Sequence, residues 1–371
     1  MAADKRIRVA VIYGGRSSEH EISLQSARSV IDHLARKRFE VLPIAIDRDG
    51  TWYAQDLKRI DSGESPALPV DASTDSTVAL EPRPGESPLS APGAAGPVDV
   101  VFPVMHGPLC EDGSIQGLLE LAAVPYVGAG VLGSAVCMDK DVAKRLARSA
   151  GIESAPYVSM RLSRWLNDPD GVRAQVADDL DYPVFVKPAN QGSSIGIHRV
   201  TAAAELEAAI EDALRYDTKV LIEQAVDARE IELAVLGAAD PSAPPEVSLP
   251  GEIVATEAFY SFERKYIEED GAELHVPADL TPEQQKEAQR IAAQIFLELE
   301  CDGMARIDLF LDRQSGRLLF NEANTIPGFT AISMYPKLWE ASGLPYGALL
   351  TRLIELALAR AERRSALKRD R

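Results

Sequence analysis

The sequence predicts an α/β and α+β chain of two or three domains. Its 371 residues exceed what one hydrophobic core usually organises. The first apolar run, Ile7–Gly15, ends in a glycine pair and is typical of a buried parallel strand that enters a tight turn. Apolar residues at helical spacing follow, and then a second apolar run, Phe39–Asp47. This order predicts a right-handed βαβ unit at the start of the chain.

The composition is that of an ordinary soluble globular protein, with 46% hydrophobic and 26% charged residues. A net charge of -18 argues against non-specific binding to nucleic acid or to anionic membranes. No apolar run reaches the roughly 18 residues of a membrane span, and the first strand leaves no room for a signal peptide. We therefore expect a cytoplasmic protein. Cys110, Cys137 and Cys301 lack metal-ligand spacing and are expected to be reduced thiols.

A candidate acidic residue follows the first strand. We expect Ser17 or Ser18 to cap the helix after the glycine pair, which places Glu19 in its first turn. Ligands gather at the carboxyl ends of parallel strands, so Glu19 is a candidate binding residue. The alternative is a glutamate that only suits the helix dipole. The apolar face of this helix, beginning at Ile22, could supply part of a dimer interface.

A further apolar run, Val98–Gly107, is preceded by a segment rich in Pro, Ser, Ala and Gly, Asp61–Pro97. We interpret this segment as a surface insertion without chemistry. The strand at 98–107 ends at His106, which we expect at the same sheet edge as Glu19 and beside Glu111. A histidine of the core is the alternative.

The central part of the chain combines two lysines with a glycine–serine loop. Lys140 lies near the start of a basic amphipathic helix, Met138–Gly151. Lys187 ends a strand that leads into the loop Gly192–Gly196. Small residues let backbone N–H groups approach a phosphate closely. A loop without a ligand can have the same composition, and Lys187 favours the phosphate site.

Two later segments are candidates for a nucleotide site. A strand–bend–strand pattern at Val220–Gly237 has Glu223 and Glu230 on either side of the bend. These carboxylates could accept hydrogen bonds from an adenine amine and a ribose hydroxyl. The aromatic and charged segment Phe259–Tyr266 has no clear periodicity, and we interpret it as a lid over a site.

A predicted β-hairpin, Arg306–Phe329, carries a set of oxygen ligands. Asp308, Glu322 and Asn324 can project from one face, because residues two apart in a strand point the same way. Such a set suits Mg2+, which completes its shell with water and phosphate oxygens. Arg306 shares the face, and a positive charge there suits a developing oxyanion. A solvated acidic face is the alternative.

Several motifs occur in a fixed order: GGRSSEHEISL, HGPLCEDGSIQG, MDK, VKPANQGSSIG, LIEQ with a following Glu, ARIDLF and NEANTIPGF. Together they resemble the D-alanine–D-alanine ligase family of ATP-grasp enzymes, over nearly the whole chain apart from 61–97 and the basic tail. The resemblance implies a Rossmann-like N-terminal domain at 1–128, a central ATP-grasp lobe at 129–224 and a C-terminal lobe at 225–371.

The resemblance also implies the reaction. Two D-alanine molecules would be joined into D-alanyl-D-alanine for peptidoglycan precursor synthesis, through an acyl phosphate formed with ATP. Two Mg2+ or Mn2+ ions would neutralise the phosphate charge. The partners would be D-alanine and ATP, without nucleic acid or membrane, and a homodimer is the family's usual form.

Residue roles follow from the matched motifs. Glu19 would bind the first substrate's ammonium group within a hydrogen-bonded set that includes Ser193 and Tyr266, and Arg306 would stabilise the tetrahedral oxyanion. The substrate contacts would be Glu19, His106, Arg306, Gly328 and Ser333. The ATP contacts would be Lys140, Lys187, Ser194, Glu223, Gln224, Val226, Glu230 and Lys265. The metal ligands would be Asp308, Glu322 and Asn324.

The chain departs from the family pattern at two positions. Cys110 stands where the family usually has Gly, so the backbone geometry of this turn can differ from the family's. Gln224 follows Glu223, and this is compatible with an adenine contact through the backbone. Tyr266 favours an amine acceptor, because related ligases that use D-lactate carry His in the corresponding role.

Two other functions are open. One is an ATP-grasp ligase with a different acceptor, including a depsipeptide ligase, which Glu19 with Ser193 and Tyr266 disfavours. The other is a nucleotide-binding protein without chemistry. A decaying site should have lost some of its reactive residues, and this chain keeps Arg306, Asp308, Glu322, Asn324 and Lys265.

Overall fold

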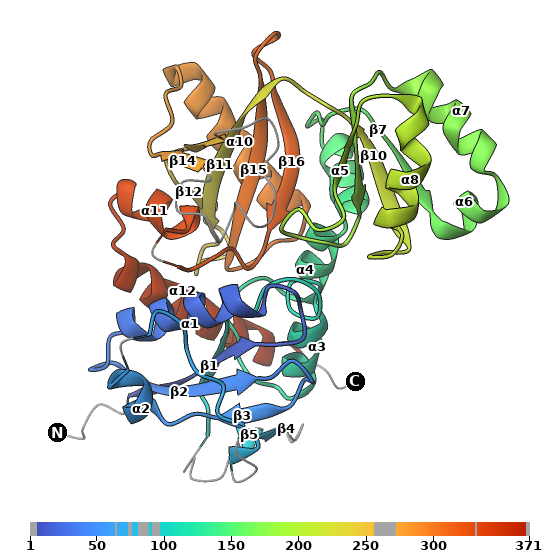
Figure 1. Ribbon diagram of the computed structural model, residues 1–371. Helices are drawn as coiled ribbons and strands as arrows, with labels where there is room; N and C mark the ends of the chain where they lie inside the picture. Colours follow the sequence, from blue (N-terminus) through green and yellow to red (C-terminus); the bar gives the residue numbers. More distant parts are fainter. Residues whose placement is uncertain are drawn as a thin grey trace.

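Three sheets of four, four and six strands organise the chain in the computed structural model (Figure 1). The structure describes residues 6–63, 65–72, 76–80, 89–90, 97–255, 272–330 and 332–368. The first sheet lies at one end of the molecule, and the other two lie side by side above it in the view of Figure 1. None of the described helices is long and apolar enough to cross a membrane.

The N-terminal sheet has the order β3-β2-β1-β6, and β1 runs parallel to both β2 and β6. Its strands are β1 (Ile7–Gly14), β2 (Phe39–Ile46), β3 (Trp52–Ala54) and β6 (Val100–Pro103). Helix α1 (His20–His33) connects β1 to β2, so the predicted βαβ unit is confirmed. Helices α3 (Ser114–Leu121) and α4 (Val131–Met138) follow β6.

The start of α1 differs from the expected serine cap. Glu19 occupies the N-cap position, and no side chain caps the helix. The Ser17 hydroxyl donates to the His106 carbonyl at 2.6 Å and accepts from the Glu19 N–H at 3.2 Å. Ser17 therefore ties the helix start to the end of β6. On the apolar face of α1, Ile22 and Ile31 are buried within the chain itself.

The described part of the expected surface insertion is anchored to the N-terminal core. Helix α2 spans Leu57–Asp61, and the short strands β4 (Ala79–Leu80) and β5 (Leu89–Ser90) pair with each other. Leu68 is buried, and its N–H donates to the carbonyl of Leu24 in α1 at 3.2 Å. This segment thus contributes to packing.

The central sheet is antiparallel, with the order β7-β10-β8-β9. Its strands are β7 (Tyr157–Arg161), β8 (Val184–Pro188), β9 (His198–Val200) and β10 (Lys219–Gln224). Helices α6 (Leu162–Asn167), α7 (Pro169–Asp179) and α8 (Ala203–Ala213) lie with it, and their apolar residues join the strands in one core. Helix α5 (Lys140–Ser149) begins after Asp139, whose carboxylate accepts from the Val142 N–H at 3.1 Å.

The C-terminal sheet has the order β14-β13-β11-β15-β16, with β12 paired to β11. Its strands are β11 (Ala228–Leu236), β12 (Glu246–Val247), β13 (Gly251–Ala255), β14 (Ala272–His275), β15 (Met304–Asp312) and β16 (Leu318–Asn324). Helix α10 (Pro282–Glu298) starts with a capping box between Thr281 and Gln284 and packs on this sheet. Ala143 and Ala147 of α5 belong to the same core.

The last helix returns to the N-terminal domain, and the helix before it packs on β11 of the C-terminal sheet. Helices α11 (Met334–Ala341) and α12 (Tyr346–Ser365) share a core with β1, β2, β6 and α1 (Figure 1). The Arg360 guanidinium, buried on α12, donates to the carbonyls of Tyr126 and Gly128 at 2.7 and 2.5 Å. The last helix of the chain therefore packs against the N-terminal domain.

Candidate active site

The predicted hairpin is present as β15 and β16. In the pairing register, Asp308 lies opposite Glu322 and Arg306 lies opposite Asn324. The Asn324 amide donates to Asp308 Oδ2 at 3.0 Å. A register shift follows Asp308, so the regular ladder is interrupted beside the acidic residues.

Two carboxylates hold the Arg306 guanidinium. Nε and Nη2 donate to the two oxygens of Asp308 at 2.8 and 2.7 Å, which is a bidentate pair. Nε also lies 3.1 Å from Oε2 of Glu232, a buried residue of β11 that is opposite Asp308 in the sheet. Sequence reasoning missed Glu232, although the alternation of β11 places it on a defined face. Both contacts restrict the orientation of the planar cation.

A cavity of about 500 Å³ lies between the central and C-terminal sheets. Residues of β8 and β10 form one wall, and residues of β11, β13, β15 and β16 form the other. Of the predicted ATP contacts, those that line it are Lys140, Lys187, Ser194, Glu223, Gln224, Val226 and Glu230. Glu322 of the hairpin lines it too. Lys265 lies outside the residues that the structure describes, as does Tyr266.

Two ammonium groups surround Glu223 within this wall. Glu223 Oε2 lies 2.9 Å from Lys187 Nζ and 3.3 Å from Nζ of Lys144, a residue that sequence reasoning missed. Burial opposes ionisation of Glu223, but the charges of Lys144 and Lys187 outweigh it and lower the pKa of the carboxyl. Lys144 follows Lys140 by four residues on α5, a helical spacing that could have indicated it.

The Gln224 side chain is held by the backbone of Asp181. Its amide accepts from the Asp181 N–H at 2.7 Å and donates to the Asp181 carbonyl at 2.6 Å. Any contact of Gln224 with an adenine therefore involves its backbone.

A second group of predicted site residues centres on Glu19. One carboxylate oxygen, Oε1, accepts from the Ser193 hydroxyl. The other, Oε2, is buried and has no hydrogen-bond partner among the described residues. A Cβ at Gly107 would come within 2.6 Å of Oε2, so glycine is needed there. Burial, followed by repulsion from Glu111, raises the pKa of Glu19. An ammonium group of a ligand would satisfy the unpaired oxygen and favour the carboxylate.

The glycine–serine loop brings Ser193 to Glu19 through unusual backbone conformations. Ser193 and Ser194 have φ values of 51° and 60°, in the left-handed region that non-glycine residues rarely adopt. Such strain is typical of functional loops. The loop connects Glu19 to the cavity between the two sheets, since both serines line that cavity.

His106 lies at the same edge as Glu19, as expected. Its Nδ1 is 3.6 Å from Glu111 Oε1, and its Nε2 is 3.1 Å from the Ser26 hydroxyl. Burial opposes protonation of His106, but the hydrogen bond and charge of Glu111 outweigh it and raise the pKa of the imidazole. His106 is thus a buried residue that is ion-paired with Glu111 and lies near Glu19.

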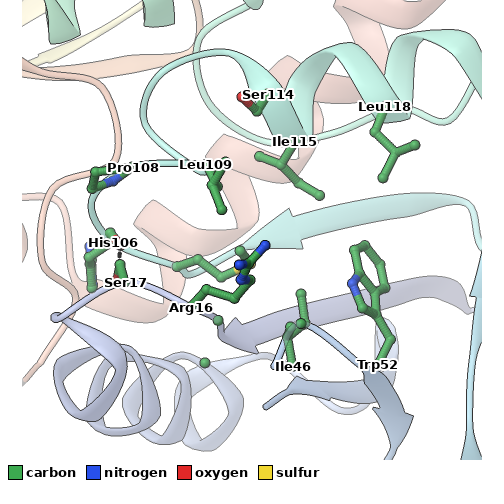
Figure 2. Close-up of a pocket in the computed structure, with 14 residues that line it drawn as sticks. Arg16, Ser17, Ile46, Trp52, His106, Pro108, Leu109, Ser114, Ile115 and Leu118 are labelled. Atoms are coloured by element: carbon green, nitrogen blue, oxygen red, sulfur yellow. Dashed lines mark hydrogen bonds between the residues drawn. The ribbon is translucent and has the colours of Figure 1, made fainter. Parts of the chain in front are cut away.

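A second, smaller cavity of about 230 Å³ adjoins this edge (Figure 2). Its walls are mostly apolar, with Ile46, Trp52, Ile115 and Leu118 around it, and Arg16 is its one lining residue with a fixed charge. It shares no lining residue with the larger cavity. His106 lines the smaller cavity, whereas Lys140, Lys187 and Glu322 line the larger one.

Gly328 and Ser333 lie together after β16. A Cβ at Gly328 would approach the Ser333 hydroxyl to 2.7 Å. That hydroxyl accepts from the Thr330 N–H at 3.0 Å and lies 2.8 Å from the Thr330 hydroxyl. Ser333 is the N-cap of α11, but its side chain makes no cap hydrogen bond. It is therefore directed toward the turn.

The three cysteines are free thiols, and two of them lie close together. Cys110 is fully buried, and the left-handed backbone falls on Leu109, with φ 73°, instead of on Cys110. The turn therefore needs no glycine at position 110. Cys137 and Cys301 are brought together, with their sulfurs 3.3 Å apart, although they are far apart in the sequence.

The hairpin residues fit a hard cation by their chemistry. Asp308 and Glu322 offer carboxylate oxygens and Asn324 an amide oxygen, beside a cavity sized for a nucleotide. No three His, Cys, Asp or Glu side chains among the described residues form a metal cluster by themselves. The set therefore suits Mg2+ shared with phosphate oxygens better than a metal held by protein alone.

Family models match both parts of the chain. The model described as D-ala D-ala ligase N-terminus matches residues 8–129, and the one described as D-ala D-ala ligase C-terminus matches residues 146–355.

Individual proteins are similar over the whole length. D-alanine--D-alanine ligase A of Bradyrhizobium diazoefficiens is 53% identical, with 99% of each chain covered. The Escherichia coli protein of that name is 45% identical, over 98% of this chain and 99% of its own. Among solved structures, the D-alanine-D-alanine ligase from Coxiella burnetii superimposes with a TM-score of 0.83 at 36% identity, covering 97% of this chain and 96% of that one. VanG D-Ala:D-Ser ligase from Enterococcus faecalis gives 0.82 at 36% identity, covering 95% and 100%.

Proposed function

This chain belongs to the D-alanine–D-alanine ligase family, and we infer that it joins two D-alanine molecules into D-alanyl-D-alanine with ATP, for peptidoglycan precursor synthesis. The structural observation that carries this inference is the cavity between the two lobes. It combines the lysines of a phosphate site with the hairpin carboxylate Glu322, next to the loop that reaches Glu19. The family's fold is the ATP-grasp fold, which the solved relatives share.

The reaction has two steps. A carboxylate oxygen of the first D-alanine attacks the γ-phosphorus of ATP, ADP leaves, and an acyl phosphate forms. The amine of the second D-alanine then attacks the acyl carbon. The tetrahedral intermediate expels inorganic phosphate, which retains one oxygen of the original carboxylate, and the attacking nitrogen releases a proton.

We propose that Glu19 binds the ammonium group of the first D-alanine. Its buried Oε2 has no hydrogen-bond partner in the part of the chain that the structure describes, which supports this role, because an unpaired buried acceptor is costly unless a ligand satisfies it. Ser193 would orient the carboxylate through its hydrogen bond to Oε1, and Tyr266 would complete the set. His106 would line the same position, held by Glu111.

Arg306 would stabilise the oxyanion of the tetrahedral intermediate. Asp308 and Glu232 fix its guanidinium before the reaction, so little reorganisation is needed when negative charge develops. Ser333, beside Gly328, would bind the carboxylate of the second D-alanine.

The phosphates would be bound by Lys140, Lys187, Lys265 and the loop at Ser194, and the adenosine by Val226, Glu230 and the Gln224 backbone. Asp308, Glu322 and Asn324 would hold two Mg2+ or Mn2+ ions, which would neutralise phosphate charge. The pairing of Lys140 with Glu322 at 3.3 Å supports a common phosphate and metal position.

We further propose a homodimer in the cytoplasm, where ATP is available. Exposed apolar residues at α3 and α4, Leu121 and Leu132, with 73% and 59% exposure, support an interface on that face. Sedimentation at the monomer mass over the working concentration range would contradict the dimer.

The function is tested by phosphate release from ATP and Mg2+ with D-alanine, L-alanine, or D-alanine together with D-lactate or D-serine, and by mass analysis of the products. We expect release that requires D-alanine and yields D-alanyl-D-alanine. A mixed product with D-lactate or D-serine in preference to D-alanine would assign a different acceptor. No release from protein that binds ATP would overturn the ligase function.

A further inference from the structure

Lys144 is the most deeply buried charged side chain in the described part of the chain. It has no exposed surface. An ammonium group in such a position is expensive unless it is paired and hydrogen-bonded, so its contacts indicate why it is there. Burial lowers the pKa of Lys144 to about 8, and the charge of Glu223 opposes that shift. Lys144 does not line either cavity described above.

The contacts of Lys144 connect the two walls of the ATP cavity. Its Nζ lies 3.3 Å from Oε2 and 3.4 Å from Oε1 of Glu223, on β10 of the central sheet. It also donates to the carbonyl of Phe320, on β16 of the C-terminal sheet, at 3.2 Å. One side chain of α5 therefore holds a residue from each sheet.

The charges in this cluster explain why the Glu223 carboxylate contacts two lysines. Glu223 alone would neutralise Lys187, the member of the cluster that lines the cavity together with it. Lys144 adds a second positive charge behind Glu223, so the three groups carry a net charge of about +1. That surplus leaves Lys187 able to attract the triphosphate.

The contact with Phe320 bears on the metal strand. The Phe320 N–H donates to the Glu153 carbonyl at 2.7 Å, so both backbone groups of this residue are held from the side of α5. Phe320 stands two residues before Glu322. Lys144 thereby fixes the hairpin strand relative to Lys187.

We propose that Lys144 is a positioning residue of the ATP site: it holds Glu223 and β16 so that Lys187 keeps its charge for the phosphates and Glu322 keeps its place opposite them. This rests on the proposed function, because it takes the cavity to be the ATP site.

The test compares Lys144→Met with Lys219→Met. Lys219 is a matched control: it is a buried lysine of the same lobe that pairs with Asp139 and Asp141 and does not line the ATP cavity. ATP dissociation constants, KM for ATP and for D-alanine, kcat and unfolding midpoints are measured for both variants and the unaltered protein. We expect Lys144→Met to weaken ATP binding about tenfold or more, the size of one charge-assisted hydrogen bond, with KM for D-alanine changed less. Lys219→Met should lose stability without this change in ATP affinity.

The double variant Lys144→Met/Glu223→Gln separates charge from packing. It removes one positive and one negative charge and leaves Lys187 unneutralised, and the new amide keeps an oxygen that can accept a hydrogen bond from adenine, so ATP affinity should recover most of the loss. The double variant also tests the proposal if the single variant Lys144→Met does not fold. Equal ATP affinity in Lys144→Met and the unaltered protein, or no recovery in the double variant, would overturn the proposal. Absence of any ATP-dependent ligation by the unaltered protein would instead overturn the proposed function.

Discussion

At the scale of single residues, the site is defined by charges that are held before any substrate binds. Arg306 is fixed by Asp308 and Glu232, and Glu223 by Lys144 and Lys187. The sequence indicated Arg306, Asp308, Lys187 and Glu223, because they belong to spaced motifs. It did not indicate Glu232 or Lys144, whose importance depends on partners distant in the chain.

Arg306→Lys should reduce kcat by about a hundredfold or more, because an ammonium cannot keep the bidentate contact with Asp308 while facing the oxyanion. ATP binding should remain largely intact, as it should in Arg306→Ala. Steady-state kinetics and ATP titration check both statements. Arg317→Lys, at an exposed ion pair on the same hairpin, is the control and should keep normal kcat. Near-normal turnover by either Arg306 variant would exclude the oxyanion role.

His106 predicts a pH dependence of stability. Its folded-state pKa is raised above its ordinary value of 6.5, since Glu111 outweighs burial. The folded protein therefore holds this proton more tightly, so the added stability is present below pH 6.5 and is lost as pH rises through the raised pKa. His106→Asn should remove this part of the dependence. Urea unfolding at several pH values above and below 6.5 measures it, and parallel curves for the two proteins would contradict the ion pair.

At the scale of elements, local patterns predicted the chain well. Alternation in β15 and β16 gave the hairpin and the face that carries Asp308 and Glu322, because a strand has a fixed period of two. The βαβ start was predicted in the same way, from two apolar runs separated by apolar residues at helical spacing. The cap of α1 was not, because the Ser17 hydroxyl donates to the His106 carbonyl in the segment after β6, and that distant contact has no local signal.

The loop before α3 gives a prediction about Cys110. Its side chain fills part of the N-terminal core, and Leu109 carries the left-handed conformation. Cys110→Gly should therefore destabilise the protein by about 1–2 kcal/mol, through lost packing and greater freedom of the unfolded chain. Ligase activity should be retained. Chemical denaturation measures the change in stability. Cys110→Ala is the comparison and is expected to lose less stability. A more stable Cys110→Gly variant would show that the turn prefers glycine.

At the scale of the whole molecule, the arrangement of the sheets makes the site, and sequence patterns carried little information about it. Lys144 and Phe320 are 176 positions apart, and Tyr126 and Arg360 are 234 apart. Such contacts depend on how the lobes pack. The resemblance to a known family supplied the domain order, whereas the return of α12 to the N-terminal core came from the structure.

Arg360 connects the last helix to the N-terminal domain, so Arg360→Met should destabilise the protein by about 2–4 kcal/mol. The substitution leaves the carbonyls of Tyr126 and Gly128 without this buried donor. KM values should change little, because Arg360 lines neither substrate cavity. Arg364→Met, at an exposed position of the same helix in an ion pair with Glu120, should change stability by only about 0.5 kcal/mol. Equal effects of the two variants on the denaturation midpoint would contradict this role of Arg360 in connecting the last helix to the N-terminal domain.

The most direct test of the central claim follows oxygen atoms through the reaction. D-alanine labelled with 18O in both carboxylate oxygens is incubated with the protein, ATP and Mg2+. The masses of the released phosphate and of the dipeptide are then measured by mass spectrometry. Activation of the carboxylate through an acyl phosphate predicts one labelled oxygen in each phosphate released. Unlabelled phosphate, released at the same rate as the dipeptide forms, would contradict the account.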